Sequence, residues 1–503
     1  MAPSAASTSS AAAAASPSAP ASSSSLPFSP PSSLLIIGAG VFGLSTALAL
    51  ARRDAFARCS ITVVDRSNPS QPGAFPSPDA ASVDSSRIIR ADYADPAYTA
   101  LGEEAQAEWR KQDKPTDLGA QGRYHKAGLI LVGDREPPAP PPGDAQTSQS
   151  EGLKPKMTGL DYARASWANV SALAAKNPQL AARIEELPNP DAIRGALGTG
   201  GGSGEWGYIN RNSGWVNATA CMAWLLDRVR ETGRVNLVAD TVVSLERDGA
   251  TITGAKLSSG RVLTADLVIV AAGAWTGGLV DLAGQVIATG QILGYMDLTE
   301  SEQSQLANIP VILNLSTGLF IIPPTDRVLK IGRHARGYIN PTPLPYPPLP
   351  SSPSSSAPQT VSLPRTTLTH PPSSPSSPTI PAEGTTSLRV ALQAMIPWPA
   401  LHARPFSRTR LCWYSDTPTA DFLVDYHPRW RGLFIATGDS GHAFKFLPVL
   451  GEKIVDCLVR EGSGEMRGKW AWRDGGEGKE VVTEDGTRGG QAGWVLEEEL
   501  ASG

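Results

Sequence analysis

A glycine-rich turn between a strand and a helix constrains the fold of this chain more than any other feature. The apolar run Leu34–Ile37 predicts a short buried strand, Ser45–Arg53 predicts a helix, and GAGVFG (38–43) lies between them. A second apolar stretch, SITVVD, ends at Asp65. This order is typical of a βαβ unit that binds a dinucleotide, because the helix N-terminus offers free N–H groups to the phosphates and the acid can accept from ribose hydroxyls.

The same spacing also occurs in an ordinary glycine-rich turn. Its place between a strand and a helix, with an acid at the end of the next strand, favours nucleotide binding. Asp65 argues against a ribose 2′-phosphate, although Arg66 beside it weakens that argument.

A second segment, residues 235–276, predicts a return of the chain to the nucleotide. It reads as a strand, then three short alternating strands with turns at Asp248-Gly249 and Ser259-Gly260, and then a buried strand, Leu267–Ala271, that runs into Gly273. A nicotinamide dehydrogenase needs no such return, whereas large flavoproteins with two dinucleotide folds approach the cofactor again in this way. FAD is therefore favoured over NAD.

A third return is predicted at residues 432–459. The strand Leu433–Ala436 enters a turn at Gly438–Gly441, and a helix runs from about Leu447 to Val459. The N-terminus of that helix would suit negative charge developing on a reduced flavin. A generic strand-to-helix turn, with Lys445 in solvent, remains the alternative.

Composition excludes several classes of partner. The 503 residues carry a net charge of −4 without a sustained basic patch, so nucleic acid and anionic membranes are not expected partners. No run reaches the roughly 18 apolar residues of a membrane span. Neither a disulfide framework nor a metal site is suggested by the scattered cysteines, and a reducing, cytoplasmic location is the expectation. These cysteines are Cys59, Cys221, Cys412 and Cys457.

Five stretches together carry a family resemblance. They are IIGAGVFGLSTALALARR, SSRIIRADYADPAY, VLKIGRHARGYINP, LCWYSDTPTADFLVDYHP and GDSGHAFKFLP, which follow one another between about residues 34 and 460. The chain resembles the FAD-dependent amine oxidases of the monomeric sarcosine oxidase family, in the branch of fungal saccharopine, L-pipecolate and fructosyl-amino-acid oxidases. The resemblance implies an α/β fold: a Rossmann-like FAD-binding domain of the GR2, D-amino-acid-oxidase-like type, and an interleaved α+β substrate domain built on a mostly antiparallel sheet.

The resemblance also implies a discontinuous domain organisation. The FAD-binding domain is expected to comprise 34–115, 212–290 and 411–461, and the substrate domain 116–211 and 291–410. Composition predicts that the Ser/Ala/Pro-rich leader 1–33 and the inserts 134–156 and 341–386 are disordered, and that 462–503 is a peripheral tail.

Cys412 has two readings. The resemblance implies that it forms a thioether with the flavin 8-methyl carbon, which needs a thiolate and hence a neighbouring cation. The two-residue period of a strand would place Arg410 on the same face. The alternative is an inert buried thiol, the reading that fits Cys221 and Cys457.

The resemblance also assigns three cations around substrate and flavin. It places Arg87 near the flavin ring, and Arg90 on the substrate carboxylate with Lys445 as the second cation. An arginine fork can hold a carboxylate through two hydrogen bonds and so orient the α-carbon. Alternatively, Arg87 and Arg90 form a surface pair beside Asp92.

Two residues of one strand complete the expected catalytic group. By alternation alone Lys330 would face water, but the family uses a lysine here to promote the reaction of reduced flavin with oxygen, since a fixed positive charge stabilises the anion that forms. His334 lies four residues further on and matches the family's active-site histidine, although a structural role is the alternative. Val83 stands where the sarcosine enzymes carry a histidine, which argues against sarcosine as the best substrate.

The remaining expected FAD contacts follow from the same motifs. They are Gly38, Gly40, Val41, Phe42, Gly43, Asp65, Arg66, Val243, Gly273, Asp439, Gly441, His442, Phe444 and Lys445.

The resulting hypothesis is a monomeric FAD-dependent oxidase of a secondary or N-substituted amino acid of the saccharopine, pipecolate or fructosyl-amino-acid type. It would oxidise the C–N bond to an imine and reduce O₂ to H₂O₂. The alternatives are a tailoring flavin oxidoreductase of fungal secondary metabolism, a flavin dehydrogenase that uses another acceptor, and a catalytically silent dinucleotide-binding protein.

Overall fold

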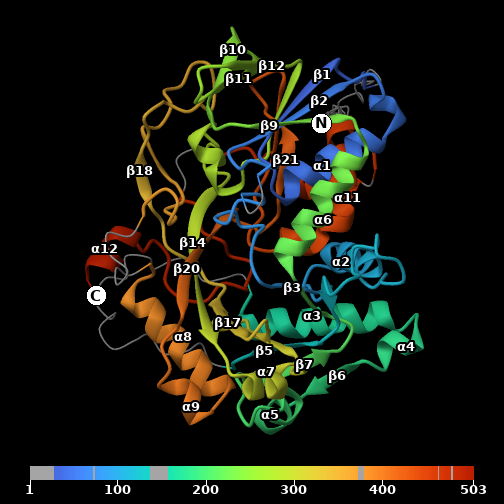
Figure 1. The fold of residues 1–503 in the computed structure, drawn as a ribbon, viewed down its shortest axis with the longest axis vertical. Coiled ribbons are helices and arrows are strands. Elements are labelled where there is room, and N and C mark those ends of the chain that lie inside the picture. Colours follow the sequence, from blue (N-terminus) through green and yellow to red (C-terminus); the bar gives the residue numbers. More distant parts are fainter. Residues whose placement is uncertain are drawn as a thin grey trace, which may run out of the picture.

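Two large sheets organise the molecule. The computed structural model describes residues 28–71, 74–135, 157–371, 379–462, 464–476 and 480–502. A six-stranded sheet forms one end of the molecule and an eight-stranded sheet the other, with helices packed around both (Figure 1).

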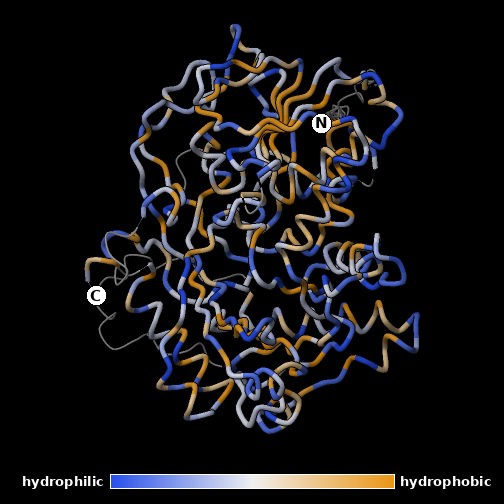
Figure 2. The backbone as a smooth tube through the Cα atoms, viewed as in Figure 1, coloured by the Kyte–Doolittle hydropathy of each residue, from blue (hydrophilic) through white to orange (hydrophobic). Residues whose placement is uncertain are grey.

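The six-stranded sheet is the expected dinucleotide-binding sheet. Its order is β21-β22-β13-β1-β2-β9, and all neighbours are parallel except the antiparallel pair β21–β22. Hydrophobic residues concentrate where these strands run side by side (Figure 2), as expected of a parallel sheet covered on both faces. The strands are β1 (Ser33–Ile37), β2 (Ser60–Asp65), β9 (Val235–Ala239), β13 (Leu267–Val270), β21 (Leu423–Tyr426) and β22 (Leu433–Thr437).

Helix α1 (Val41–Arg52) packs against α10 (Leu447–Val459) and α6 (Ala218–Glu231) beside this sheet. A Cβ atom on Gly451 would lie 2.0 Å from the carbonyl oxygen of Ser45, so α1 and α10 approach each other closely. The antiparallel sheet of β10 (Val242–Asp248), β11 (Thr251–Leu257) and β12 (Val262–Thr264) confirms the three alternating strands expected after the second return.

The eight-stranded sheet has the order β20-β14-β17-β16-β15-β5-β7-β6 and is antiparallel except for the pair β15–β5. This confirms the expected mostly antiparallel sheet. Its strands are β5 (Leu129–Gly133), β6 (Ile184–Leu187), β7 (Trp206–Asn210), β14 (Ile287–Asp297), β15 (Val311–Asn314), β16 (Leu319–Thr325), β17 (Val328–Arg333) and β20 (Arg408–Asp416).

Smaller elements connect and cover the sheets. Strands β3 (Arg87–Ile89), β4 (Tyr124–His125) and β8 (Gly214–Val216) form a three-stranded sheet. The remaining helices are α2 (Pro96–Trp109), α3 (Gly159–Ala174), α4 (Pro178–Ala181), α5 (Pro190–Leu197), α7 (Glu300–Leu306), α8 (Ala382–Met395), α9 (Pro399–His402), α11 (Gly464–Trp470) and α12 (Leu496–Ala501), with the 3₁₀ segments η1 (Asp54–Phe56), η3 (Gly273–Gly278) and η4 (Ala443–Phe446).

The expected domain boundaries at 290/291 and 410/411 each cut a continuous strand. Strands β14 and β20 pair without interruption from Ile287↔Asp416 to Tyr295↔Arg408, which places Cys412 opposite Gln291 in the eight-stranded sheet. The pair runs from the middle of the molecule into its lower half (Figure 1). The strand that carries Cys412 therefore belongs to the sheet expected for the substrate domain.

The expected disorder of the insert 341–386 is wrong for residues 341–371 and 379–386. Strands β18 (Pro341–Pro343) and β19 (Thr360–Ser362) pair with each other, and residues 382–386 begin α8. Leu349 is buried, and its backbone exchanges hydrogen bonds of 2.7–2.8 Å with residues 279 and 281. Such contacts come from residues far away in the sequence, so the Pro/Ser composition gives no sign of them.

The two other segments expected to be disordered lie largely outside the described residues. Of the leader 1–33, residues 1–27 are outside, and Ser33 begins β1. Of the insert 134–156, residues 136–156 are outside.

The expectation of a peripheral tail is also wrong. Trp470 is fully buried, and its indole Nε1 donates to the Tyr98 hydroxyl at 2.9 Å. Arg488 is buried as well and forms an ion pair with Asp416. These residues occur singly in a Gly-rich, charged stretch, so they produce no periodic pattern from which packing could be predicted.

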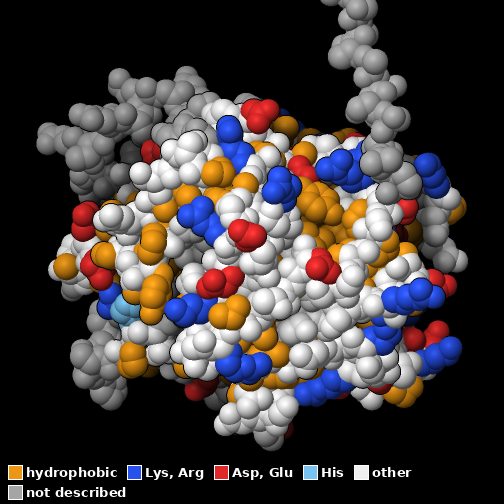
Figure 3. Space-filling view, turned by 90° about the horizontal axis from the view of Figure 1, so that it is seen from above, with side chains coloured by type: hydrophobic (Ala, Val, Ile, Leu, Met, Phe, Trp, Pro, Cys, Tyr) orange, Lys and Arg blue, Asp and Glu red, His pale blue; other side chains and the backbone are white. Residues whose placement is uncertain are grey.

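The surface above the six-stranded sheet carries interspersed side chains of both charges (Figure 3). Among the described residues, no helix has the length and apolar character to cross a membrane.

Candidate active site

One cavity of about 520 Å³ brings together residues from all five family-like stretches. Both sheets contribute to its wall. Of the expected site residues, those that line it are Gly38, Gly40, Val41, Phe42, Asp65, Arg66, Arg87, Arg90, Val243, Gly273, Lys330, His334, Cys412, Asp439, Gly441, His442, Phe444 and Lys445. Gly43 does not line it but lies beneath the turn, where an added Cβ would be 1.9 Å from the Gly38 carbonyl oxygen.

The glycine-rich turn requires glycine at its first position. Gly38 has φ of +106°, and a Cβ there would lie 2.5 Å from the carbonyl oxygen of Ala271 at the end of β13. Any side chain at this position would therefore be strained and would clash. The turn leaves space in front of the first residues of α1, which suits a pyrophosphate.

Asp65 and Arg66 stand at the end of β2. Asp65 accepts hydrogen bonds from the backbone N–H of Ala39 at 2.7 Å and of Ser67 at 2.8 Å, so it ties the turn to the neighbouring strand. Arg66 forms an ion pair with Asp79 at 2.7 Å, and its guanidinium lies 4.2 Å from the centroid of the Trp275 ring. Because the charge of Arg66 is already paired, the residue does not offer a free cation for a 2′-phosphate.

Cys412 lies on the cavity wall with 3 % of its surface exposed. The cation on its sulfur is Arg87, whose Nη2 donates to Sγ at 3.4 Å. The expectation that Arg410 would fill this place is wrong, since its guanidinium donates to the carbonyl oxygens of Val83 and Ala80. The thioether expected from the resemblance needs a cation beside the sulfur, and Arg87 occupies that place.

The other cysteines lie outside the lining of this cavity. All four cysteines of the chain are free and buried. Burial raises the pKa of Cys457 to about 12 and the pKa of Cys221 well above that of an ordinary thiol. Inert, protonated thiols are therefore the fitting description for both.

Asp84, which is not among the residues predicted from the sequence, anchors the two cations nearest Cys412. Lys330 Nζ lies 2.6 Å from Asp84 Oδ2 and donates to the Ser86 carbonyl oxygen at 2.7 Å, while Arg87 forms a second ion pair with the same carboxylate. Tyr295 donates its hydroxyl to Asp84 Oδ1 at 2.8 Å. The only sign of Asp84 in the sequence is that it is an acid three residues before Arg87, in a stretch (80–86) whose other residues are small or apolar.

Burial and charge shift the pKa values of this cluster in opposite senses. Burial opposes the charge of Asp84, but the adjacent Lys330 and Arg87 cations hold its pKa well below the usual range. Burial lowers the pKa of Lys330 to about 8, although Asp84 counteracts part of that shift. Lys330 is thus a buried ammonium that can lose its proton near pH 8.

Arg90 and Lys445 form a second, less compensated pair of cations. Each is 6 % exposed, and neither forms an ion pair within the described part of the chain. The Nη1 atom of Arg90 is buried and has no hydrogen-bond partner among the described residues. Lys445 Nζ donates to the His442 carbonyl oxygen at 3.0 Å. Burial lowers the pKa of Lys445 well below its ordinary value, and the Arg90 charge adds to that shift.

The alternative of a surface pair beside Asp92 is therefore wrong. Arg87 and Arg90 face the cavity, whereas Asp92 is buried and accepts hydrogen bonds from Tyr208, Asn210 and Ser213. Two buried cations that face one cavity without a carboxylate in contact are suited to bind an anionic group of a ligand.

A second cavity of about 350 Å³ adjoins this pair and shares Arg90, His334 and His442 with the first. Aromatic rings line much of it: the Arg90 guanidinium lies 4.5 Å from the centroid of the Tyr93 ring, and Tyr162 faces it from α3. The rest of a ligand whose anionic group lies on Arg90 and Lys445 could extend into this space.

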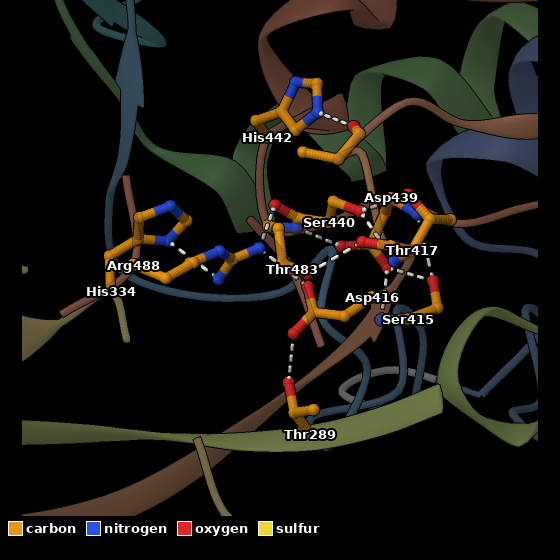
Figure 4. A network of polar contacts seen from close by, with 12 residues as sticks. Thr289, His334, Ser415, Asp416, Thr417, Asp439, Ser440, His442, Thr483 and Arg488 are labelled. Carbon is orange, nitrogen blue, oxygen red and sulfur yellow. Dashed lines mark hydrogen bonds and ion pairs between the residues drawn. The ribbon is translucent and has the colours of Figure 1, made fainter. Parts of the chain in front are cut away.

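His334 separates the two cavities directly after β17. Its ring contacts Arg488 from the C-terminal segment (Figure 4). It also contacts Thr487 from the same segment. Those two residues were missed, because nothing in the Gly-rich sequence around them indicates that the segment returns to the site.

The residues present fit FAD. The glycine cradle can approach a pyrophosphate, the polar residues at the end of β2 stand at the nucleotide end, and the wall continues to a thiol held by a guanidinium and to a buried ammonium. Together these provide contacts for both ends of a flavin dinucleotide.

Comparison with known proteins gives the same assignment. Residues 33–457 match the family described as "DAO: FAD dependent oxidoreductase". The chain is 33 % identical over 486 residues to amino acid oxidase imqH of Aspergillus flavus, covering 86 % of this chain and 94 % of that protein. It is 25 % identical to L-saccharopine oxidase of Schizosaccharomyces pombe over 461 residues, or 89 % and 95 % of the two chains.

Solved structures share the fold. The fructosamine oxidase Amadoriase II of Aspergillus fumigatus superposes with a TM-score of 0.68 at 26 % identity, over 92 % of this chain and 95 % of that one. A thermally stable fructosyl peptide oxidase mutant gives a TM-score of 0.72 at 24 % identity, over 93 % and 98 %, which supports the fold alone. The family match, together with the glycine-rich turn and the cavity, shows that the chain belongs to the DAO family of FAD-dependent oxidoreductases.

Proposed function

We propose that this protein is an oxidase of a secondary or N-substituted amino acid, which oxidises the C–N bond to an imine while O₂ is reduced to H₂O₂. The observation that carries the proposal is the pair of buried cations Arg90 and Lys445. They face the same cavity as Cys412 and Lys330, and neither of them forms an ion pair with a carboxylate of the described chain.

In this proposal Arg90 and Lys445 hold the substrate carboxylate. The free Nη1 of Arg90 donates to one oxygen and the Lys445 ammonium to the other, which fixes the α-carbon relative to the cavity wall. The ring of Tyr93, packed on both cations, keeps water away from them. Inside a dry pocket such charged hydrogen bonds are stronger than in water.

When bound, FAD would supply the electron acceptor for this oxidation and the redox chemistry that connects it to oxygen. Lys330 provides the positive charge that favours reduction of oxygen, because an ammonium fixed between Asp84 and Ser86 needs no reorganisation as negative charge develops. The ammonium also holds a proton at Nζ that it can exchange near pH 8.

We further propose that Cys412 tethers FAD covalently, with Arg87 stabilising the thiolate. The measurement is the mass of the denatured protein: the wild type should carry the added mass of FAD and stay yellow, and Cys412→Ser should lose both. Cys457→Ser, a change at a buried thiol outside the cavity lining, is the matched control and should retain the flavin. Free FAD released by the denatured wild type would rule out the tether.

The relatives narrow the substrate class. Those named above are an amino acid oxidase and a saccharopine oxidase, and the aromatic walls of the second cavity leave space for a bulky substituent. The same observation supports a second candidate with the same chemistry, a tailoring oxidase that acts on a bulky amino-acid-derived amine in fungal secondary metabolism.

The test is a peroxide assay with sarcosine, pipecolate, saccharopine and fructosyl-valine. We expect peroxide from one of the bulkier amino acids and little from sarcosine. Anaerobic bleaching of the flavin without peroxide in air would favour a dehydrogenase, and neither signal from any amine would contradict the oxidase assignment.

We also propose that the enzyme works as a cytoplasmic monomer. One chain supplies every side chain of the proposed site, and four free cysteines suit a reducing compartment. Light scattering of the purified protein and fractionation of the source cells test these two points.

A further inference from the structure

The C-terminal segment around Asp485–Arg488 lies beyond the family-matched residues 33–457, yet it returns to the centre of the site. Asp485 and Thr487 line the second cavity, and Arg488 lies between His334 and Asp416 (Figure 4). The segment therefore forms part of the wall of the second cavity, next to His334, which separates the two cavities.

Arg488 is held by a carboxylate and a backbone carbonyl oxygen. Its Nη2 lies 2.7 Å from Asp416 Oδ1 and donates to the Ser440 carbonyl oxygen at 2.8 Å. The other carboxylate oxygen of Asp416 accepts from the Thr289 hydroxyl at 2.5 Å. The side chains of Arg488 and Asp416 are 1 % and 3 % exposed, so water does not compete for the hydrogen bonds between them.

The partners of His334 permit only one neutral tautomer. Arg488 Nη1 lies 3.3 Å from Nδ1, and since a guanidinium can only donate, Nδ1 must be the acceptor. Thr487 Oγ1 lies 3.2 Å from Nε2. The Thr487 hydroxyl is 2.8 Å from both carboxylate oxygens of Asp485, so its proton goes there and a lone pair faces His334. The ring proton therefore sits on Nε2.

A charged His334 would be opposed by burial and by the cations around it, although the Asp485 carboxylate lies behind Thr487 on the Nε2 side. Its second proton would have to sit on Nδ1, directly against the Arg488 guanidinium. Burial lowers the pKa of His334 well below the ordinary value, and the positive charges of Arg488, Arg90 and Lys445, with the nearby His442, lower it further. The ring of Tyr414, 5.8 Å away between centroids, brings no charge.

We propose that Thr487 and Arg488 are positioning residues that hold His334 as a neutral Nε2–H imidazole, which therefore does not take the proton of the substrate's amine. The proposal deepens the proposed function and rests on it for the identity of the substrate. Its consequence is that the amine must bind already unprotonated, so that the pH at which flavin reduction becomes efficient is set by the substrate and not by His334.

Nitrogen NMR of protein labelled with [¹⁵N]histidine tests the tautomer without any turnover. The chain has only six histidines, and His334→Asn assigns the signal. We expect a single Nε2–H tautomer that does not titrate between pH 6 and 9. An Nδ1–H tautomer, or protonation in the ordinary histidine range, would overturn the proposal.

Two variants test the two contacts separately. In Thr487→Val the Nε2 proton loses its acceptor, so its signal should shift and exchange faster with water, while Thr487→Ser should restore the wild-type signal.

The double variant Arg488→Met/Asp416→Asn tests the other contact and leaves no unpaired buried charge. In this variant we expect the pH at which His334 becomes protonated to rise by at least about one unit. An unchanged His334 signal in Thr487→Val, or in the folded double variant, contradicts the proposal. Thr483→Val, which removes a hydrogen bond to the Thr417 carbonyl in the same segment, is the control and should leave His334 unchanged.

Flavin reduction supplies a second readout. With the best substrate and an analogue whose amine pKa is lowered by an electron-withdrawing substituent, the midpoint of the anaerobic pH profile should move with the substrate. A midpoint that stays fixed would identify His334 or another protein group as the base. Absence of flavin reduction by any amine would contradict the proposed function, whereas the NMR result would stand on its own.

Discussion

At the scale of single residues, the site is defined by which buried charges have partners. Lys330 and Arg87 share the carboxylate of Asp84, whereas Arg90 and Lys445 have no such counter-ion among the described residues. The first group is complete in the protein alone, and the second is complete only with an anionic ligand. This difference separates residues that hold the site together from the two residues to which the proposed function assigns the substrate carboxylate.

Asp84→Asn tests the first group. The change leaves two buried cations facing a neutral amide, and breaking a buried ion pair from one side costs about 3–5 kcal/mol. We therefore expect the free energy of unfolding, measured in urea at pH 7.5, to fall by that order. Asp227→Asn removes an exposed partner of Arg230 and should change it by less than about 0.5 kcal/mol. An Asp84→Asn protein as stable as the wild type would show that this cluster is not a stabilising ion pair.

Lys330 gives a prediction for pH. Its pKa is lowered to about 8, so the ammonium is present below that pH and lost above it. Oxidation of the reduced flavin by O₂, followed by stopped flow, should therefore slow as the pH rises through 8. Lys330→Met should react more slowly by a factor on the order of a hundred and lose this pH dependence. If Lys330→Met reacts with oxygen as fast as the wild type, the lysine has another role.

Individual residues could be predicted only where a motif marks them. The glycines, Cys412 and the cations at 87, 90, 330 and 445 stand in recognisable stretches, and the structure gathers them around one cavity. Asp84 and Arg488 connect these stretches through side-chain contacts. Asp84 binds Lys330, which is 246 residues away in the chain, and Arg488 binds Asp416, which is 72 residues away. Contacts of that kind depend on the finished fold, which a local pattern does not contain.

At the scale of elements, the predictions succeeded where periodicity or glycine placement was decisive. The strands expected at Leu34–Ile37, Leu267–Ala271 and Leu433–Ala436 are confirmed as β1, β13 and β22 to within one residue at each end. The predictions of disorder and of a peripheral tail, which used composition alone, failed. The Pro/Ser-rich insert packs through buried residues such as Leu349, and the Gly-rich tail packs through Trp470. A single large side chain can fasten a polar segment without altering its composition.

The close contact of α1 with α10 yields a prediction at this scale. In Gly451→Ala the new Cβ would lie 2.0 Å from the Ser45 carbonyl oxygen, so the two helices must separate. We expect a loss of about 1–3 kcal/mol in the free energy of unfolding, measured by chemical denaturation. Gly468→Ala, in α11 where a Cβ would meet no described atom within 4 Å, should instead stabilise by roughly 0.5–1 kcal/mol. Equal effects of the two changes would contradict the close packing.

At the scale of the whole molecule, the cavity lies where segments far apart in the chain meet. Its wall takes residues from the first βα turn, from the insert at Leu344–Tyr346, from β17 and β20, and from η4. The sequence predicted three returns to one nucleotide, and the fold accounts for them: β1, β13 and β22 are neighbours in one parallel sheet, so their carboxyl ends meet. It could not predict that the insert would add to the wall.

This arrangement predicts that FAD stabilises both sheets together. A ligand that binds only the folded state raises its stability by RT ln(1 + [L]/Kd), or about 2.7 kcal/mol at a hundredfold excess over Kd. In Cys412→Ser, where we expect FAD to be exchangeable, the melting temperature of the apoprotein should rise steadily with added FAD, in one transition seen both by circular dichroism and by tryptophan fluorescence. NADP⁺, whose 2′-phosphate would meet Asp65 and an already paired Arg66, serves as the control and should leave the melting temperature unchanged. Two separate transitions, only one of them sensitive to FAD, would show that the cavity does not couple the two halves.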